Sequence, residues 1–281
     1  MSLQLQPNTS LVLTQEVAYI SYAGHHLAIT FETPDLMEDV HRIFGKLLTT
    51  NPPSVFHTLN IRKIDSGYAI DGVSEMESKL DSQRSTLQHL KFEVIHQFIK
   101  LTPNHLWLHA AGASLEEKGI LLSGAWGKGK STIVSELCER GALYLSDDIV
   151  PIDMTSGSLM PFHLTPMRRE YEDAHASLSP VEVSNLSKRI IDLSADSYAR
   201  SGVQLAAIIL PEYTPEATTA LVPHSPALTT MTLLENCLNL KTKKEQAVRF
   251  LGSLVECVPV YRLPYNDGAA GAALIMDLIT E

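Results

Sequence analysis

The chain is poor in cysteine and has no long apolar run, and each shortage excludes a class of protein. Its 281 residues include three cysteines, Cys138, Cys237 and Cys257, and none of them belongs to a CxxC pair. An odd number of widely spaced cysteines argues against a disulfide framework and against a zinc site. No apolar run reaches the roughly 18 residues that a membrane-spanning helix needs.

Positive charge is also scarce. The chain carries 22 Lys and Arg against 32 Asp and Glu, a formal net charge of −10. An acidic chain has no long-range attraction for nucleic acid or for an anionic membrane, so we expect neither as a partner. The first seven residues lack the basic and then apolar pattern of a secretory signal, and the expected location is cytoplasmic. A homo-oligomer is compatible with the sequence.

The hydrophobic pattern predicts two α/β parts, 1–103 and 104–281. In the first part, residues 11–13, 17–22, 26–31, 59–64 and 68–71 resemble strands, and 36–48 resembles a helix. A second, amphipathic helix carries apolar residues in steps of three and four from Leu87 to Leu101, and Pro103 fits its end.

The second part alternates short apolar runs with helical ones, as a βαβ core does. We expect strands at 106–112, 119–123, 142–146, 205–210 and 258–263. We expect helices at 130–140, 227–238, 243–254 and 269–279. A long polar stretch separates residues 153 and 200.

The strand expected at 119–123 leads into a complete GxxxxGK[ST] motif, and the helix expected at 130–140 follows it. A strand, glycine loop and helix in this order direct backbone N–H groups at phosphate oxygens, and the helix N-terminus adds partial positive charge. Lys130 would reach the β- and γ-phosphates, and the Ser131 hydroxyl would bind Mg²⁺. The predicted nucleotide-binding residues are Gly124, Ala125, Trp126, Gly127, Lys128, Gly129, Lys130, Ser131 and Thr132.

Two adjacent carboxylates, Asp147 and Asp148, follow the strand expected at 142–146. The carboxyl end of a strand in an α/β sheet is where ligands bind. One carboxylate can hold Mg²⁺ while the other accepts the proton of an attacking hydroxyl. Adjacent side chains on a strand point to opposite faces, so the chain must turn there for both to reach the metal. Ser131 and Asp148 are the predicted metal ligands, although the residues do not settle which aspartate is the base.

His109 ends or interrupts the strand before the glycine loop. A hairpin through residues 116–119 would bring it back beside the loop, where it could contact the γ-phosphate or orient the acceptor. The predicted catalytic residues are His109, Lys130, Asp147, Asp148 and Arg189. Arg189 belongs to one of two basic pairs, 168–169 and 188–189, that could stabilise charge on the transferring phosphoryl group.

His109, the loop at 124–131 and the pair at 147–148 together resemble the HPr kinase family. The stretch from His109 to Asp153 is similar to divergent HPr-kinase-related serine kinases, some of which act on peptide precursors such as those of lasso peptides. The resemblance implies an α/β fold related to the HPr kinase C-terminal domain and to phosphoenolpyruvate carboxykinase. It also implies ATP, Mg²⁺ and phosphoryl transfer to serine. The family's E-I-R-G-L-G segment has no counterpart here, so the resemblance does not extend to HPr as substrate or to phosphorolysis.

The residues and the resemblance together predict an ATP- and Mg²⁺-dependent kinase acting on a serine of a peptide or protein. Two alternatives stay open from the sequence. One is a kinase for a small-molecule hydroxyl, because variable loops build acceptor pockets. The other is a nucleotide-binding regulatory module without kinase activity.

Overall fold

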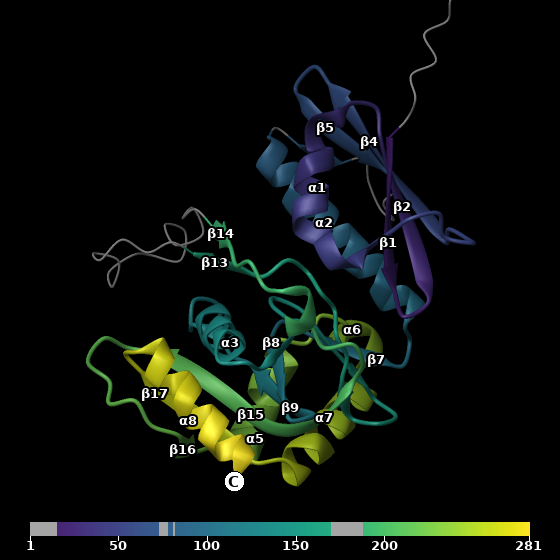
Figure 1. Cartoon of the computed structure of the whole chain (residues 1–281). Helices are drawn as coiled ribbons and strands as arrows, with labels where there is room; N and C mark the ends of the chain where they lie inside the picture. The colour runs from purple at the N-terminus through teal and green to yellow at the C-terminus, as the bar shows by residue number, and fades with distance from the viewer. Residues whose placement is uncertain (1–15, 73–77, 81, 170–187) are drawn as a thin grey trace, which may run out of the picture. The chain divides into compact units, whose positions relative to one another are not determined.

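The computed structural model describes residues 16–72, 78–80, 82–169 and 188–281 (Figure 1). The strand expected at 11–13 lies outside these ranges. The chain divides into two compact units. The first comprises the chain up to Ile43 together with Leu48–Phe98, and the second comprises Phe44–Leu47 and Ile99–Glu281. The main division falls between Phe98 and Ile99, whereas the sequence predicts a boundary after Pro103.

The first unit is a six-stranded sheet with two helices on one of its faces (Figure 1). Its strand order is β3-β1-β2-β4-β5-β6. Burial alternates along β1, whereas three consecutive residues of β2, 27–29, are buried. Ile20, Leu27 and Ile29 are fully buried. The Phe98 ring of α2 packs edge-on against Tyr22 of β1, with 5.6 Å between ring centroids. The elements of this unit are β1 (Glu16–Tyr22), β2 (His25–Phe31), α1 (Met37–Phe44), β3 (Leu48–Thr49), β4 (His57–Ile64), β5 (Gly67–Asp71), β6 (Ser78–Leu80) and α2 (Gln83–Leu101).

The second unit is built on a nine-stranded mixed sheet. Seven strands follow the order β10-β8-β9-β15-β12-β11-β7, while β17 pairs with both β15 and β16. The strands are β7 (His105–Leu108), β8 (Ala111–Leu115), β9 (Lys118–Leu122), β10 (Leu143–Ser146), β11 (Val150–Asp153), β12 (Ser158–Leu159), β15 (Val203–Tyr213), β16 (Val222–Pro223) and β17 (Val260–Tyr265). A separate two-stranded ladder joins β13 (Met167–Arg169) and β14 (Lys188–Ile190).

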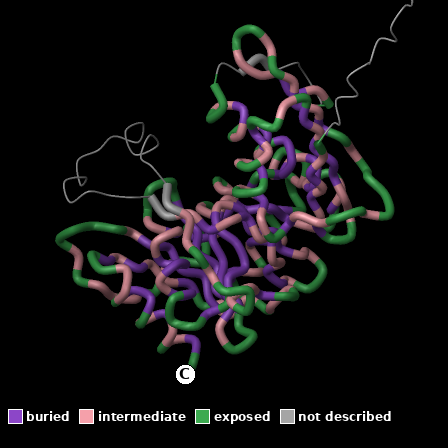
Figure 2. Tube along the Cα trace, turned by 45° about the horizontal axis from the view of Figure 1, so that its top comes forward, coloured by how far each residue is buried: buried purple, intermediate pink, exposed green. Residues whose placement is uncertain are grey.

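Helices cover both faces of this sheet. The helix α3 (Lys130–Glu139) shares one apolar cluster with α8 (Gly268–Thr280), and this cluster includes Ile120 and Leu122 of β9. The helices α5 (Pro226–Glu235) and α7 (Glu245–Cys257) share a second cluster with Leu121 of the same strand. A short helix, α6 (Leu240–Lys243), lies between α5 and α7 in the chain. Because successive strand residues face opposite sides, β9 contributes to both layers of the core. Figure 2 shows these buried stretches along the strands.

The predicted α/β class is confirmed, and one predicted strand is wrong in detail. The run 106–112 is two strands, because β7 ends at Leu108 and β8 begins at Ala111. β7 pairs with β11, whereas β8 pairs with β9 and β10. The break between them carries His109, whose backbone N–H donates to the carbonyl of Asn236 (2.8 Å). Within the described residues, no helix is long and apolar enough to cross a membrane.

Candidate functional site

The sheet register gathers the predicted site residues at one edge of the second unit. β8 runs antiparallel to both β9 and β10, with Ala111 opposite Leu122 and Gly112 opposite Ser146. The amino end of β8 and the carboxyl ends of β9 and β10 therefore meet at one edge. His109 precedes that end of β8, the glycine loop follows β9, and the aspartate pair follows β10.

The antiparallel ladder between β7 and β11 also brings His109 and Asp148 to this edge. β11 starts at Val150, opposite Leu108 at the end of β7. Asp148 and His109 therefore leave this ladder at the same end. The predicted hairpin that returns the chain to the loop is present between β8 and β9. Glu116 and Glu117 form its turn, with φ of 49° and 63°, the positive values that a two-residue hairpin turn requires.

The glycine loop connects β9 to α3, and three of its glycines adopt backbone conformations with positive φ. Gly124, Gly127 and Gly129 have φ of 137°, 80° and 92°. Residues other than glycine rarely adopt such values. Gly129 is the residue before the first turn of α3. A β-carbon there would lie 1.7 Å from the Tyr265 hydroxyl at the end of β17. The loop therefore packs against a buried tyrosine that the sequence analysis did not single out.

Lys130 follows this loop as the first residue of α3 and is only 6% exposed. Its ammonium group donates to the carbonyl oxygens of Gly124 (2.8 Å) and Ala125 (3.2 Å). A buried ammonium needs such acceptors, because an uncompensated buried charge is strongly destabilising. The cation is therefore held at the centre of the loop, where a bound phosphate would lie.

Ser131 and Asp147 form a direct contact between the loop helix and β10. The Ser131 hydroxyl donates to Asp147 Oδ1 (3.0 Å), which also accepts from the Asp148 backbone N–H (3.0 Å). Asp147 is 7% exposed, whereas Asp148 is half-buried. Asp148 has φ of 74°, so the chain turns sharply after Asp147. The sequence predicts such a bend if both carboxylates are to reach one metal ion.

The charge of Asp147 contributes to the raised pKa values of two neighbouring side chains, Cys138 and Tyr144. Burial, with the Asp147 charge as a second cause, raises the pKa of the Cys138 thiol to about 12. Burial also raises the pKa of Tyr144 well above its usual value, again with Asp147 contributing. Both groups therefore stay protonated at neutral pH.

The other residues predicted for the site lie in the first turn of α3, in the loop, after β7 and in β14. Thr132 follows Ser131 in the first turn of α3, and residues 125–128 form the exposed part of the loop, where Trp126 is 39% exposed. His109 is half-buried. Arg189 pairs with Arg168 across the β13–β14 ladder, and both side chains lie outside the described part of the structure.

Magnesium would be held by few protein groups. In the described ranges, no cluster of three or more His, Cys, Asp and Glu residues could hold a metal. Mg²⁺ usually keeps several waters and takes one or two carboxylates together with substrate phosphates. Ser131 with the aspartate pair beside the phosphate loop fits that ligand set. The site would thus bind the metal as part of a metal–nucleotide complex.

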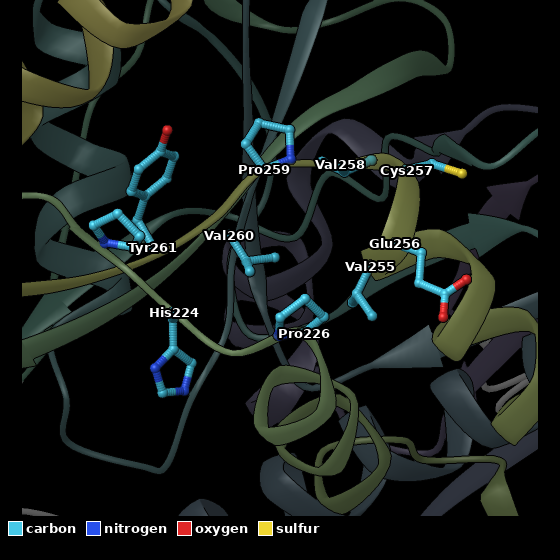
Figure 3. A pocket seen from close by; sticks show the side chains of 10 residues that line it. His224, Pro226, Val255, Glu256, Cys257, Val258, Pro259, Val260 and Tyr261 are labelled. Atoms are coloured by element: carbon cyan, nitrogen blue, oxygen red, sulfur yellow. The ribbon is translucent and has the colours of Figure 1, made fainter.

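A separate hollow of about 360 Å³ lies where β17 begins (Figure 3). It is lined by residues that include His224, Pro226, Val255, Cys257, Pro259 and Tyr261. β17 runs parallel to β15, which runs parallel to β9. The hollow therefore lies at the amino ends of these strands, opposite the edge that carries the glycine loop. It was not predicted from the sequence.

Comparisons with known proteins add little. No protein-family model and no curated protein match the chain. Among the solved structures that match is the HPr(Ser) kinase/phosphatase from Coxiella burnetii. It is 16% identical with a TM-score of 0.32, and the match covers 62% of this chain and 88% of that chain. A likeness of this degree does not establish a shared activity.

Proposed function

We propose that the chain is an ATP- and Mg²⁺-dependent kinase that transfers the γ-phosphoryl group to a serine hydroxyl of a peptide or protein. The observation that carries the proposal is the Ser131–Asp147 hydrogen bond. It joins the phosphate loop to a pair of carboxylates at the same sheet edge. Phosphoryl transfer depends mainly on positioning and charge stabilisation, and this edge offers groups for both.

The loop would bind the phosphates and the metal. Backbone N–H groups between Gly124 and Thr132 and the Lys130 ammonium would bind phosphate oxygens. The Ser131 hydroxyl and a carboxylate would hold Mg²⁺, which supplies positive charge to the β- and γ-phosphates. The hydrogen bond to Ser131 favours Asp147 as that carboxylate, although the sequence analysis gave this role to Asp148.

Asp148 is then the better candidate for the base. It is more exposed than Asp147 and lies beyond the sharp turn, so an acceptor hydroxyl can approach it. The serine oxygen would form a bond to the γ-phosphorus while the bond to the ADP oxygen breaks. The hydroxyl proton would pass to the Asp148 carboxylate. His109, at the same edge, would orient the acceptor.

The test compares Lys130→Ala with a matched control. Lys241→Ala also removes one lysine charge, from an exposed position in α6. Both variants and the unaltered protein are incubated with γ-labelled ATP, Mg²⁺ and a library of serine peptides, with the alanine-substituted library alongside. We expect labelled serine peptides from the unaltered protein and from Lys241→Ala, and none from Lys130→Ala.

Three outcomes decide between the readings. Equal labelling by a folded Lys130→Ala variant would contradict the phosphate site. Transfer to small hydroxyl compounds but to no peptide would favour the small-molecule kinase. Nucleotide binding without transfer to any acceptor would favour a regulatory module.

A further inference from the structure

The strand order fixes which way a nucleotide would lie in the proposed site. β10, with the aspartate pair, lies on one side of β9, and β15 and β17 lie on the other. The transferred phosphoryl group must lie beside the carboxylates that bind metal and accept the proton. A triphosphate held by the loop after β9 would therefore extend its nucleoside toward β15 and β17.

Two tyrosines end those two strands. Tyr213 and Tyr265 are directly paired in the parallel β15–β17 ladder, so their side chains share one face of the sheet. Tyr265 is 1% exposed and packs on Gly129 of the loop, whereas Tyr213 is 50% exposed. The two rings meet edge to face, with centroids 5.5 Å apart. An exposed ring is thus held beside the phosphate loop by a buried one.

The junction between β17 and α8 borders the same space. A β-carbon on Gly268 would lie 3.0 Å from the Thr132 methyl group, so the start of α8 flanks the first turn of α3. The backbone N–H of Thr214 donates to the Tyr265 carbonyl (2.9 Å). The Thr219 hydroxyl donates to Asn266 Oδ1 (3.1 Å). These bonds join the segment that follows β15 to the end of β17 and to the residue after it.

We propose that Tyr213 forms the base subsite of the nucleotide site, by stacking its exposed ring on the heterocyclic base. The inference rests on the proposed function, because it takes the phosphates to occupy the glycine loop. Every heterocyclic base has a large π-face, and an aromatic side chain can stack on it whichever base it is. Half the Tyr213 surface is exposed although its neighbour is fully buried, and a stacked base would cover it.

The experiment separates the base from the phosphates. Calorimetry measures the binding of Mg²⁺–ATP and of Mg²⁺–tripolyphosphate, which lacks base and sugar, to the full chain. The variants are Tyr213→Ala, Tyr213→Phe and the control Phe92→Ala, which removes an exposed ring from α2. Tyr213→Ala should weaken ATP binding about 5- to 150-fold. It should leave tripolyphosphate binding unchanged, and Tyr213→Phe should retain the ATP affinity.

Four other results would contradict the role of Tyr213 or the proposed function. If Tyr213→Ala binds ATP as tightly as the unaltered protein, Tyr213 does not stack on the base. If it weakens both ligands equally, Tyr213 acts on the loop and not on the base. If the unaltered protein binds both ligands equally well, the base subsite is refuted while the phosphate site stands. If it binds neither ligand, the proposed function itself fails.

Discussion

Replacing Gly129 by alanine tests the packing of the phosphate loop most directly. Gly129 has φ of 92°, and its position for a β-carbon lies 1.7 Å from the Tyr265 hydroxyl and 2.8 Å from the adjoining ring carbon. Tyr265 is 1% exposed, so its ring is packed on all sides by protein. Gly129→Ala therefore faces both a strained backbone and a collision with a buried ring.

The magnitude follows from adding these two effects. A left-handed backbone costs a non-glycine residue about 1–2 kcal/mol. Overfilling a packed core costs about 1–3 kcal/mol. The free energy of unfolding should therefore fall by about 2–5 kcal/mol. Gly127→Ala shares the positive φ but has no atom within 4 Å of its β-carbon position, so it should lose only the first contribution.

Urea unfolding followed by tryptophan fluorescence is the appropriate assay. The chain has two tryptophans, Trp107 and Trp126, and both belong to the second unit. Gly252→Ala in α7 is the matched control, because its β-carbon also meets nothing within 4 Å and its φ is not positive. It should be neutral or stabilise by up to about 1 kcal/mol.

The test compares the loss in free energy of unfolding for Gly129→Ala, Gly127→Ala and Gly252→Ala. If Gly129→Ala lost no more stability than Gly127→Ala, the contact between Tyr265 and the loop would be refuted. Tyr265→Phe removes the nearest atom and leaves the 2.8 Å contact. It should therefore recover only part of the loss in the double variant.

Four further variants test polar and charged groups at and near the site. Ser131→Ala and Asp147→Asn should each raise the Mg²⁺ concentration needed for half-maximal transfer by about tenfold or more, as a titration with Mg²⁺ would show. Asp148→Asn should lower the transfer rate by about 10² to 10⁴ while nucleotide binding stays near normal; lost binding with an unaltered rate per bound nucleotide would contradict its role as base. Burial lowers the pKa of His163 to about 4, so between pH 6.5 and 4 the unfolded chain binds a proton that the folded chain does not. Stability should fall by about 3 kcal/mol as pH drops through that window. His163→Phe should remove this loss, and urea midpoints that change with pH as in the unaltered protein would show that His163 is not its source.

The local parts of the site could be predicted because local chemistry dictates them. An apolar run before three glycines, followed by a helical pattern, specifies a strand, a loop and a helix. The turn after Asp147 could also be expected, because two adjacent carboxylates cannot otherwise share a site. The hairpin at Glu116 and Glu117 follows from two strands separated by a short polar turn.

Contacts between distant segments could not be predicted in the same way. The run 106–112 has no polar interruption except His109, so periodicity gives one strand. The break arises because β7 and β8 pair with different strands and because the His109 N–H finds Asn236. Likewise, Tyr265 lies 136 residues from Gly129, and only the parallel pairing of β15 with β9 and β17 brings it to the loop.

Lys130 has a structural contact that the motif alone does not predict. The sequence indicates a lysine that serves only phosphate, so its removal should leave the fold intact. In the structure its buried ammonium group holds two loop carbonyls, of Gly124 and Ala125. Charged phosphate oxygens are stronger acceptors than neutral carbonyls, so nucleotide binding would draw the ammonium toward phosphate. The same lysine would then hold the loop together before the nucleotide binds and hold the phosphates afterwards.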